Sequence, residues 1–293
     1  MKVLILGGSG MLGHTLFRYL SEDSSLDVFA TVRSSKELSG WLPADRLKKV
    51  CRDVDIYQID RLVKVFAEVR PNLVVNCIGI IKQVPEALDP IATITTNALL
   101  PHRIAGLCGA AGARMIQISS DCVFDGEQGS YTESDFSNAT DLYGRTKLLG
   151  ETTYPHCITL RTSIIGHELK GNYGLVEWFL SQEKVVHGLR KAIYSGFPTI
   201  ELARIIRDYV IPNSEMTGLY HVSSNPISKY ELLKLIKVQY GKQIELEPED
   251  SFRLDRSLDS SRFRSLTGYN PPKWPELVRE MYNDYWQGPY QKD

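Results

Sequence analysis

Hydrophobic residues follow two alternating patterns in the first half of the chain. Short apolar runs such as Val3-Leu4-Ile5-Leu6 predict strands that are buried on both faces. Leucines recur every four residues between Leu12 and Leu20, a spacing typical of one face of a helix. Alternation of this kind indicates right-handed βαβ crossovers and a parallel sheet covered by helices on both faces. Further strands are predicted over residues 27–33, 73–81, 115–120 and 158–165, and further helices over 62–69, 95–107 and 141–151.

The alternation becomes irregular after about residue 166. Helices are predicted there over residues 175–181, 200–210, 229–241 and 277–286. The third of these helices begins with a capping box, in which the Ser228 hydroxyl and the Glu231 carboxylate each bond an otherwise unpaired amide. We therefore expect a smaller lobe that is woven onto the sheet domain, with an approximate boundary at residue 165.

Composition and charge narrow the class of protein. Hydrophobic residues make up 43% of the chain, which is enough for a substantial core. The 34 basic and 35 acidic residues give a net charge of −1, which argues against a nucleic-acid partner. No apolar run reaches the roughly 18 residues of a membrane span, and no small-residue cleavage site follows the apolar start. We expect a soluble, cytoplasmic protein without a membrane partner; the sequence leaves a homo-oligomer open.

Cysteine and histidine spacing gives no sign of a disulfide framework or a metal site. The five cysteines form no CxxC pair, and an odd number fits reduced thiols in the cytoplasm. The six histidines form no HxxxH or HExxH pair. We therefore expect no metal.

A glycine-rich segment joins the first predicted strand to the first predicted helix. Its spacing is Gly7-x-x-Gly10-x-x-Gly13. In such a turn the first glycine permits the bend, the second lets backbone amides approach a pyrophosphate, and the third allows close helix–strand packing. A flexible glycine-rich turn is the alternative, but the strand–turn–helix context favours a dinucleotide site. We expect a Rossmann-type doubly wound parallel sheet over residues 1–165.

The end of the second predicted strand bears on the choice of cofactor. A carboxylate there, about 20 residues beyond the glycines, would select NAD by binding the ribose 2′-hydroxyl, whereas an arginine accommodates the 2′-phosphate of NADP. The residue at that distance from Gly13 is Arg33, with no carboxylate beside it. NADP(H) is therefore favoured and NAD(H) is left open, as is a solvated loop role for Arg33.

Tyr143 and Lys147 lie four residues apart, on one face of a predicted helix. Two other pairs have this spacing, but only Tyr143 follows a strand that ends in hydroxyl groups, at Ser119 and Ser120. The carboxyl ends of parallel strands line the ligand crevice, so Ser120 shares an edge with the glycine loop. A neighbouring ammonium favours the phenolate of a tyrosine, and Ser120 would hold a carbonyl oxygen in line for its proton. The three residues suit hydride transfer between a nicotinamide and a carbonyl or carbinol.

These motifs resemble an extended short-chain dehydrogenase/reductase, and more narrowly the dTDP-4-dehydrorhamnose reductase family of nucleotide-sugar reductases. The resemblance rests on the glycine loop, Ser119–Gly126, Tyr143–Lys147 and Leu160–Ser163. It implies catalytic roles for Ser120, Tyr143 and Lys147, supported by Asn97. It implies substrate contacts at Ser120, Asp121 and Cys122. The cofactor would contact Gly7, Ser9, Gly10, Met11, Leu12, Gly13, Arg33, Asp55, Ile56, Cys77, Ile78, Gly79, Tyr143, Lys147, Thr162 and Ser163.

The expected lobe over residues 166–293 is assigned to substrate binding. Its candidates for ring packing, hydrogen bonding and diphosphate charge are Asn172, Trp178, Pro198-Thr199 and Arg256. A planar guanidinium suits a diphosphate because it forms bidentate, charge-assisted hydrogen bonds. The alternative for Arg256 is a surface ion pair with Asp255 or Asp259.

Two departures from the family pattern bear on the sugar. The family usually shows Ser-Thr-Asp-Tyr where this chain has Ser119-Ser120-Asp121-Cys122, and its segment after the fourth strand differs from Cys77–Gln83. The leading hypothesis is reduction of the C4 keto group of a nucleotide-activated 4-keto-6-deoxyhexose, in deoxysugar and polysaccharide biosynthesis. Alternatives are a UDP-N-acetylamino-4-keto sugar as substrate, a nucleotide-sugar epimerase or dehydratase, and a non-catalytic NADP-binding regulatory subunit.

Overall fold

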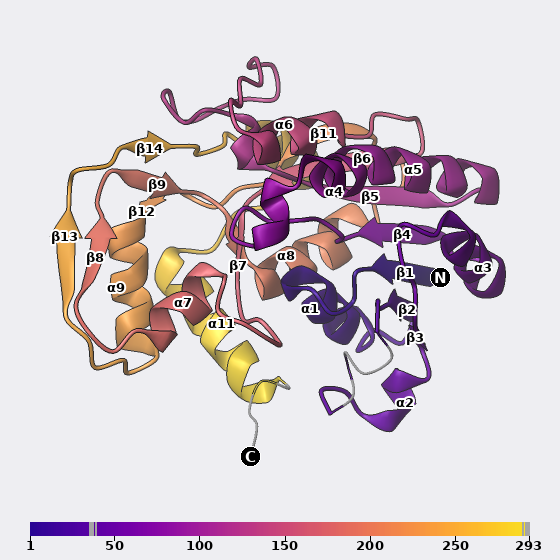
Figure 1. Ribbon diagram of the computed structural model, residues 1–293, viewed down its shortest axis with the longest axis horizontal. Coiled ribbons are helices and arrows are strands. Elements are labelled where there is room, and N and C mark those ends of the chain that lie inside the picture. The colour runs from indigo at the N-terminus through magenta and orange to yellow at the C-terminus, as the bar shows by residue number, and fades with distance from the viewer. Residues whose placement is uncertain (35–37, 39, 289, 291–293) are drawn as a thin grey trace.

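A seven-stranded parallel sheet forms the centre of the computed structural model, which describes residues 1–34, 38, 40–288 and 290 (Figure 1). Its strand order is β11-β6-β5-β4-β1-β2-β3, the Rossmann order extended by one strand. The predicted α/β fold class is therefore confirmed. The strands are β1 (Lys2–Leu6), β2 (Asp27–Thr31), β3 (Val50–Cys51), β4 (Leu73–Asn76), β5 (Arg114–Ser120), β6 (Cys157–Thr162) and β11 (Gly218–His221).

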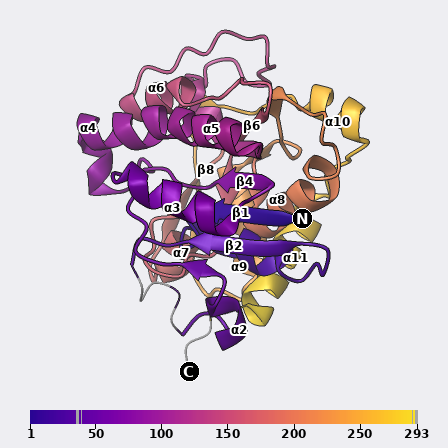
Figure 2. The same ribbon diagram turned by 90° about the vertical axis from the view of Figure 1, so that its right-hand side faces the viewer.

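Alternate residues of the central strands face two different cores. Val3 and Ile5 pack with Leu16 of α1 (Met11–Leu20), whereas Leu4 and Leu6 pack on the opposite face of the sheet. That second face is covered by α3 (Ile59–Val69) and α5 (Leu100–Ala111). Figure 2 shows α5 on one side of the sheet and α11 (Trp274–Gln287) on the other. Burial on both faces explains why these strands consist of unbroken apolar runs.

The chain beyond residue 166 builds a side lobe and also returns to the sheet. The lobe, on the left in Figure 1, contains small sheets with the orders β12-β9-β14 and β13-β8. In contrast, β11 pairs with β6 at the edge of the main sheet, and Thr199 of α8 bonds Thr15 of α1. The elements here are β7 (Ile164–Ile165), α7 (Leu175–Ser181), β8 (Val186–Leu189), β9 (Ala192–Tyr194), β10 (Phe197–Pro198), α8 (Thr199–Ile205), η4 (Ile206–Val210), β12 (Ile227–Ser228), α9 (Lys229–Gln239), β13 (Leu246–Glu249), β14 (Leu254–Asp255) and α10 (Ser261–Thr267).

Short helical pieces complete the first half of the chain. They are α2 (Ala44–Leu47), η1 (Pro85–Leu88), α4 (Pro90–Thr93), η2 (Ile94–Leu99), η3 (Asp121–Val123) and α6 (Leu142–Leu149). The predicted helix over 95–107 is thus interrupted, since η2 is a π-helical stretch before α5. The predicted helix over 200–210 likewise ends in π geometry, in η4. None of the described helices is long and apolar enough to span a bilayer.

Other predicted features also differ from the structure. The strand over 73–81 ends at Asn76, because the Asn76 side chain accepts the Ile78 amide and turns the chain. The strand over 158–165 breaks after Thr162, and its second part pairs with β10. Only one of the two bonds of the predicted capping box forms. Ser228 Oγ accepts the Glu231 amide, but the Glu231 carboxylate contacts Lys234 Nζ at 3.2 Å instead of the Ser228 amide.

Candidate active site

The glycine loop follows β1 and leads into α1. Gly7 has a φ of +83°, a conformation that side chains with a Cβ rarely adopt, and its carbonyl accepts the Gly10 amide at 3.0 Å. A Cβ at Gly13 would lie 2.0 Å from the Gly7 carbonyl oxygen, so only glycine fits there. No side chain caps α1 at Gly10. The amides of its first turn are therefore directed at the space in front of the helix, as an anion site requires.

A cavity of about 370 Å³ adjoins this loop. Arg33 is exposed at its wall and takes part in none of the hydrogen bonds or ion pairs of the described residues. The one carboxylate in the lining, Glu168, already accepts the Gly174 amide at 2.9 Å. Helix amides and two cationic side chains fit the phosphates of a dinucleotide. The lining residues are Ser9, Gly10, Met11, Arg33, Glu168, Leu169 and Lys170.

The other expected cofactor residues lie at the carboxyl ends of neighbouring strands. Gly7 packs against the backbone of Cys77 and Ile78, which follow β4. Asp55, beyond β3, accepts the Tyr57 amide and thereby fixes the turn that carries Ile56. Thr162 and Ser163 follow at the end of β6. This is the edge of an open parallel sheet where ligands bind.

Ser120 and Lys147 both lie at the carboxyl end of β5. Lys147 Nζ donates to the Ile118 carbonyl at 2.7 Å, which ties α6 to that strand. Ser120 Oγ accepts the Cys122 amide at 3.1 Å and donates to Asp121 Oδ1 at 3.2 Å, and the hydroxyl is close enough to Tyr143 to act on the pKa of its phenol. The structure therefore brings together the serine, tyrosine and lysine singled out in the sequence.

The charges around these groups follow from their burial. Burial lowers the pKa of Lys147 to about 8, while Glu151, Cys122 and Cys77 act in the opposite direction. Burial also raises the pKa of Tyr143, and the neighbouring Cys122 adds to that increase, whereas the Ser120 hydroxyl reduces it. Tyr143 is thus a protonated phenol at neutral pH beside a largely protonated amine.

Asn97 lies in the π-helical stretch η2, a geometry frequent at functional sites. Its carboxamide accepts the Ile80 amide and donates to the Ile80 carbonyl, each at 2.9 Å. A Cβ on Gly79 would lie 3.4 Å from Asn97 Oδ1 and 4.0 Å from Lys147 Nζ. Asn97 therefore holds the segment after β4 in place next to the buried lysine.

A buried ion pair fixes the far end of α6. Arg161 of β6 donates through Nε and Nη2 to the Glu151 carboxylate at 2.7 and 2.8 Å. Ser119 Oγ donates to the same carboxylate at 2.7 Å. The pair links β5, β6 and the turn after Lys147. Sequence reasoning used Arg161 only as part of a motif, because a partner ten residues away has no local signature.

Asp121 and Cys122 lie near Tyr143, and Arg256 contacts Cys122. Arg256 Nε donates to the Phe124 carbonyl at 2.7 Å, and its Nη1 lies 3.7 Å from Cys122 Sγ. Burial raises the pKa of Asp121, and the Arg256 charge partly offsets that rise. Among the ion pairs of the described residues, none joins Arg256 to Asp255 or Asp259, and the guanidinium bonds Phe124 and Cys122 instead.

Asn172 and Trp178 are both exposed, in the segment before α7 and within it. Gly174, between them, packs against Met11, so this segment borders the glycine loop. Among the hydrogen bonds and ring contacts between described residues, none joins either side chain to Ser120, Tyr143 or Arg256. The structure therefore does not gather these two residues with the catalytic group.

Sequence reasoning missed Lys82. Its Nζ donates to Asp141 Oδ2 at 2.7 Å and lies 5.4 Å from the centroid of the Tyr143 ring. The only sequence signal was its place in the segment that departs from the family pattern. Position 82 lies about 60 residues from position 143, so no spacing argument joins them.

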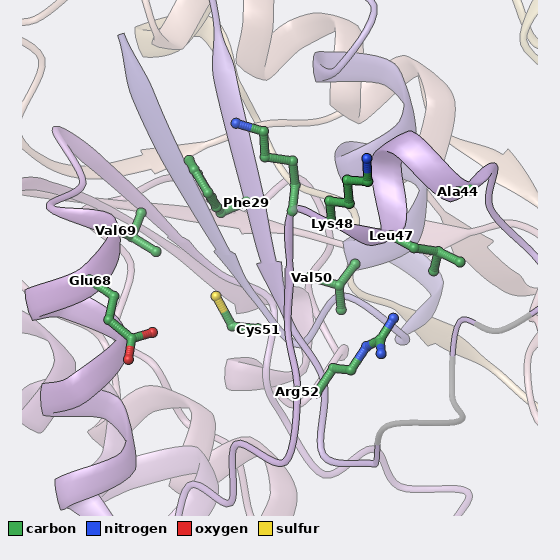
Figure 3. Close-up of a pocket in the computed structure, with 10 residues that line it drawn as sticks. Phe29, Ala44, Leu47, Lys48, Val50, Cys51, Arg52, Glu68 and Val69 are labelled. Carbon is green, nitrogen blue, oxygen red and sulfur yellow. The ribbon is translucent and has the colours of Figure 1, made fainter.

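A larger cavity of about 750 Å³ lies elsewhere, between the β2–β3 edge and α3. Figure 3 shows its lining, with Glu68 and Val69 facing Phe29 and Cys51. No expected site residue lines it, and Lys49 on its wall is already paired with Asp27 at 2.7 Å. The smaller cavity, in contrast, is lined by Ser9, Gly10, Met11 and Arg33, which are expected cofactor residues. Within the described ranges, no cluster of three or more His, Cys, Asp or Glu side chains is arranged to hold a metal ion.

Comparison with known proteins agrees with this fold. The dTDP-4-dehydrorhamnose reductase of Aggregatibacter actinomycetemcomitans is 24% identical over 96% of this chain and 98% of its own. The methionine adenosyltransferase 2 subunit beta of Bos taurus is 32% identical, over 51% of this chain and 41% of its own. The crystal structure of dTDP-4-dehydrorhamnose reductase from Bacillus anthracis in complex with NADP shares the fold, with a TM-score of 0.79 and 22% identity over 97% and 98% of the two chains. Residues 1–286 match the family described as RmlD substrate binding domain, and the chain belongs to that family.

Proposed function

We propose that the protein is an NADPH-dependent reductase of the C4 keto group of a nucleotide-activated 4-keto-6-deoxyhexose. The observation that carries this proposal is the meeting of Ser120, Tyr143 and Lys147 at the sheet edge that also holds the glycine loop. A relative that aligns over nearly the full length of both chains is named dTDP-4-dehydrorhamnose reductase. A cytoplasmic location is part of the proposal, since the five free cysteines fit a reducing compartment.

The glycine-loop side would hold the cofactor. The amides at the start of α1 would bind the pyrophosphate, and Arg33 would bind the 2′-phosphate. Asp55 and Ile56 would border the adenine, with Cys77–Gly79 along the crevice and Thr162-Ser163 beside the nicotinamide. When bound, NADPH supplies the hydride that reduces the carbonyl carbon.

The chain's own residues would supply and control the proton. Ser120 would donate a hydrogen bond to the substrate carbonyl oxygen and hold it in line with the Tyr143 hydroxyl. The Tyr143 O–H bond breaks as a new O–H bond forms on the C4 oxygen, which leaves a phenolate. The Lys147 ammonium stabilises that phenolate, and Asn97 supports the return of a proton.

The opposite side of Tyr143 would bind the nucleotide sugar. Asp121 and Cys122 would border the sugar, and Arg256 would bind the diphosphate. Asn172 and Trp178 remain candidates for the nucleotide end. An NADP complex in a solved structure of the same fold supports the choice of cofactor.

The first experiment is a screen of dTDP-, UDP- and GDP-linked 4-keto-6-deoxy sugars, including N-acetylamino forms, for oxidation of NADPH. We expect turnover with one class and its loss in Tyr143→Phe, by about 10²–10⁴-fold in kcat. NADPH binding should change little, since the ring still packs. A variant with more than a tenth of wild-type kcat would refute the role of Tyr143.

The same preparation separates the alternatives. NAD that stays bound through purification would favour an epimerase or dehydratase, whereas exchangeable NADPH favours the reductase. Tight NADPH binding without turnover of any sugar would favour a regulatory subunit, the class suggested by the similarity to methionine adenosyltransferase 2 subunit beta.

A further inference from the structure

Lys82 lies on the segment between β4 and η1 and reaches across to α6. Its ammonium bonds Asp141 at 2.7 Å and lies 5.4 Å from the centre of the Tyr143 ring. We propose that Lys82 is a positioning residue, which neutralises Asp141 beside Tyr143 and so keeps the tyrosine hydroxyl able to release its proton. This inference rests on the proposed function, in which that proton goes to the substrate.

Asp141 has both carboxylate oxygens occupied. Oδ1 accepts the Gly144 amide at 2.8 Å and so caps α6, and Oδ2 accepts from Lys82. Asp141 precedes Tyr143 by two residues, and these two bonds fix its carboxylate in position. There its negative charge opposes the formation of a phenolate at Tyr143. With Lys82 in place the pair carries no net charge.

The remaining charged groups near Tyr143 do not replace Lys82. Asp121 and Cys122, from η3, also disfavour the phenolate. Arg256 approaches from the segment after β14, but its guanidinium bonds the Phe124 carbonyl and Cys122. Lys147, on the same helix, donates to the Ile118 carbonyl. Of the described cations, Lys82 is the one found over the tyrosine ring.

The pair contributes little to the stability of the fold. Its side chains are 33% and 41% exposed, and ion pairs that water screens add little to the stability of a fold. Removal of Lys82 should therefore leave the folded protein intact while it changes the field at Tyr143. A change in activity can therefore be measured without a change in folding.

The test is the pH dependence of kcat/KM for reduction in Lys82→Met. Loss of the cation raises the pKa of Tyr143, so the alkaline limb should move to higher pH by about half a unit or more, and kcat at pH 7 should fall severalfold because the acid is weaker. Lys82→Arg should restore the wild-type profile. Lys48→Met, which removes an exposed lysine on the distant β3 side, is the matched control and should change neither quantity.

Asp141→Asn gives the opposite sign with the cap preserved, because asparagine also accepts the Gly144 amide. The alkaline limb of the kcat/KM profile of Asp141→Asn should move to lower pH. The pKa of Lys147 depends on Glu151, Cys122 and Cys77, and not on Lys82 or Asp141. Opposite shifts of the alkaline limb in the variants at positions 82 and 141 would therefore come from Tyr143. Profiles of both variants that overlay the wild type would overturn the inference. Failure of the wild-type protein to oxidise NADPH with any of the screened sugars would instead refute the proposed function itself.

Discussion

The two sides of Tyr143 are built in different ways. The glycine-loop side consists mostly of backbone, contributed by one short stretch of chain between β1 and α1. The opposite side consists of side chains, and they come from four separate segments that include Lys82, Cys122, Asp141 and Arg256. The first side offers amides to a group common to all dinucleotides, whereas the second offers charges that suit one substrate class. We therefore expect a single substitution to abolish cofactor binding on the glycine-loop side, and only to weaken substrate binding on the opposite side.

The largest effect is expected for Gly13→Ala. The added Cβ would lie 2.0 Å from the Gly7 carbonyl oxygen, so the loop backbone must shift. Its amides would then no longer point toward the pyrophosphate. We expect the Kd for NADPH to rise by about 100-fold or more, which corresponds to about 2.7 kcal/mol. Fluorescence titration of NADPH measures this directly.

The matched control is Gly106→Ala in α5, where an added Cβ meets no atom within 4 Å. That variant should bind NADPH like the wild type. Near-normal NADPH affinity in Gly13→Ala would show that the loop relaxes without loss of the site. It would contradict the expected difference between the two sides of Tyr143.

A smaller effect is expected for Arg256→Ala on the opposite side. If the guanidinium binds the substrate diphosphate, KM for the nucleotide sugar should rise at least about tenfold, or about 1.4 kcal/mol, with the Kd for NADPH unchanged. Arg253→Ala, an exposed neighbour, is the control. Equal KM values for Arg256→Ala and the wild type would move the diphosphate site elsewhere in the lobe.

The smallest effect is expected for Arg33→Asp, which should alter preference rather than binding as such. The change removes the candidate 2′-phosphate partner and supplies a carboxylate for the ribose hydroxyls, so the ratio of kcat/KM for NADPH over NADH should fall severalfold. Arg52→Asp, at the cavity of Figure 3, makes the same change of charge away from the glycine loop. An unchanged ratio in Arg33→Asp would mean that this side chain faces solvent in the complex.

Sequence reasoning worked best where structure is local. The strand Val3–Leu6, the glycine turn and the helix after it occupy one continuous segment, and each is set by residues within a few positions of one another. It worked less well at the π-helical stretch around Asn97 and at the end of β4. There the backbone is shaped by bonds between Asn97 and Ile80, and between Asn76 and Ile78, which no periodicity encodes.

The sequence by itself determined the parallel α/β sheet, the nucleotide-binding turn and the pairing of Tyr143 with Lys147, because periodicity and short spacings carry that information. Only the tertiary structure decided the surroundings of the tyrosine. Lys82 comes to Tyr143 from about 60 residues away, and Arg256 comes to Cys122 from 134 residues away, where it also bonds the Phe124 carbonyl. Contacts of that kind depend on how whole strands and helices pack, and the local pattern of a chain does not record which distant side chains that packing brings together.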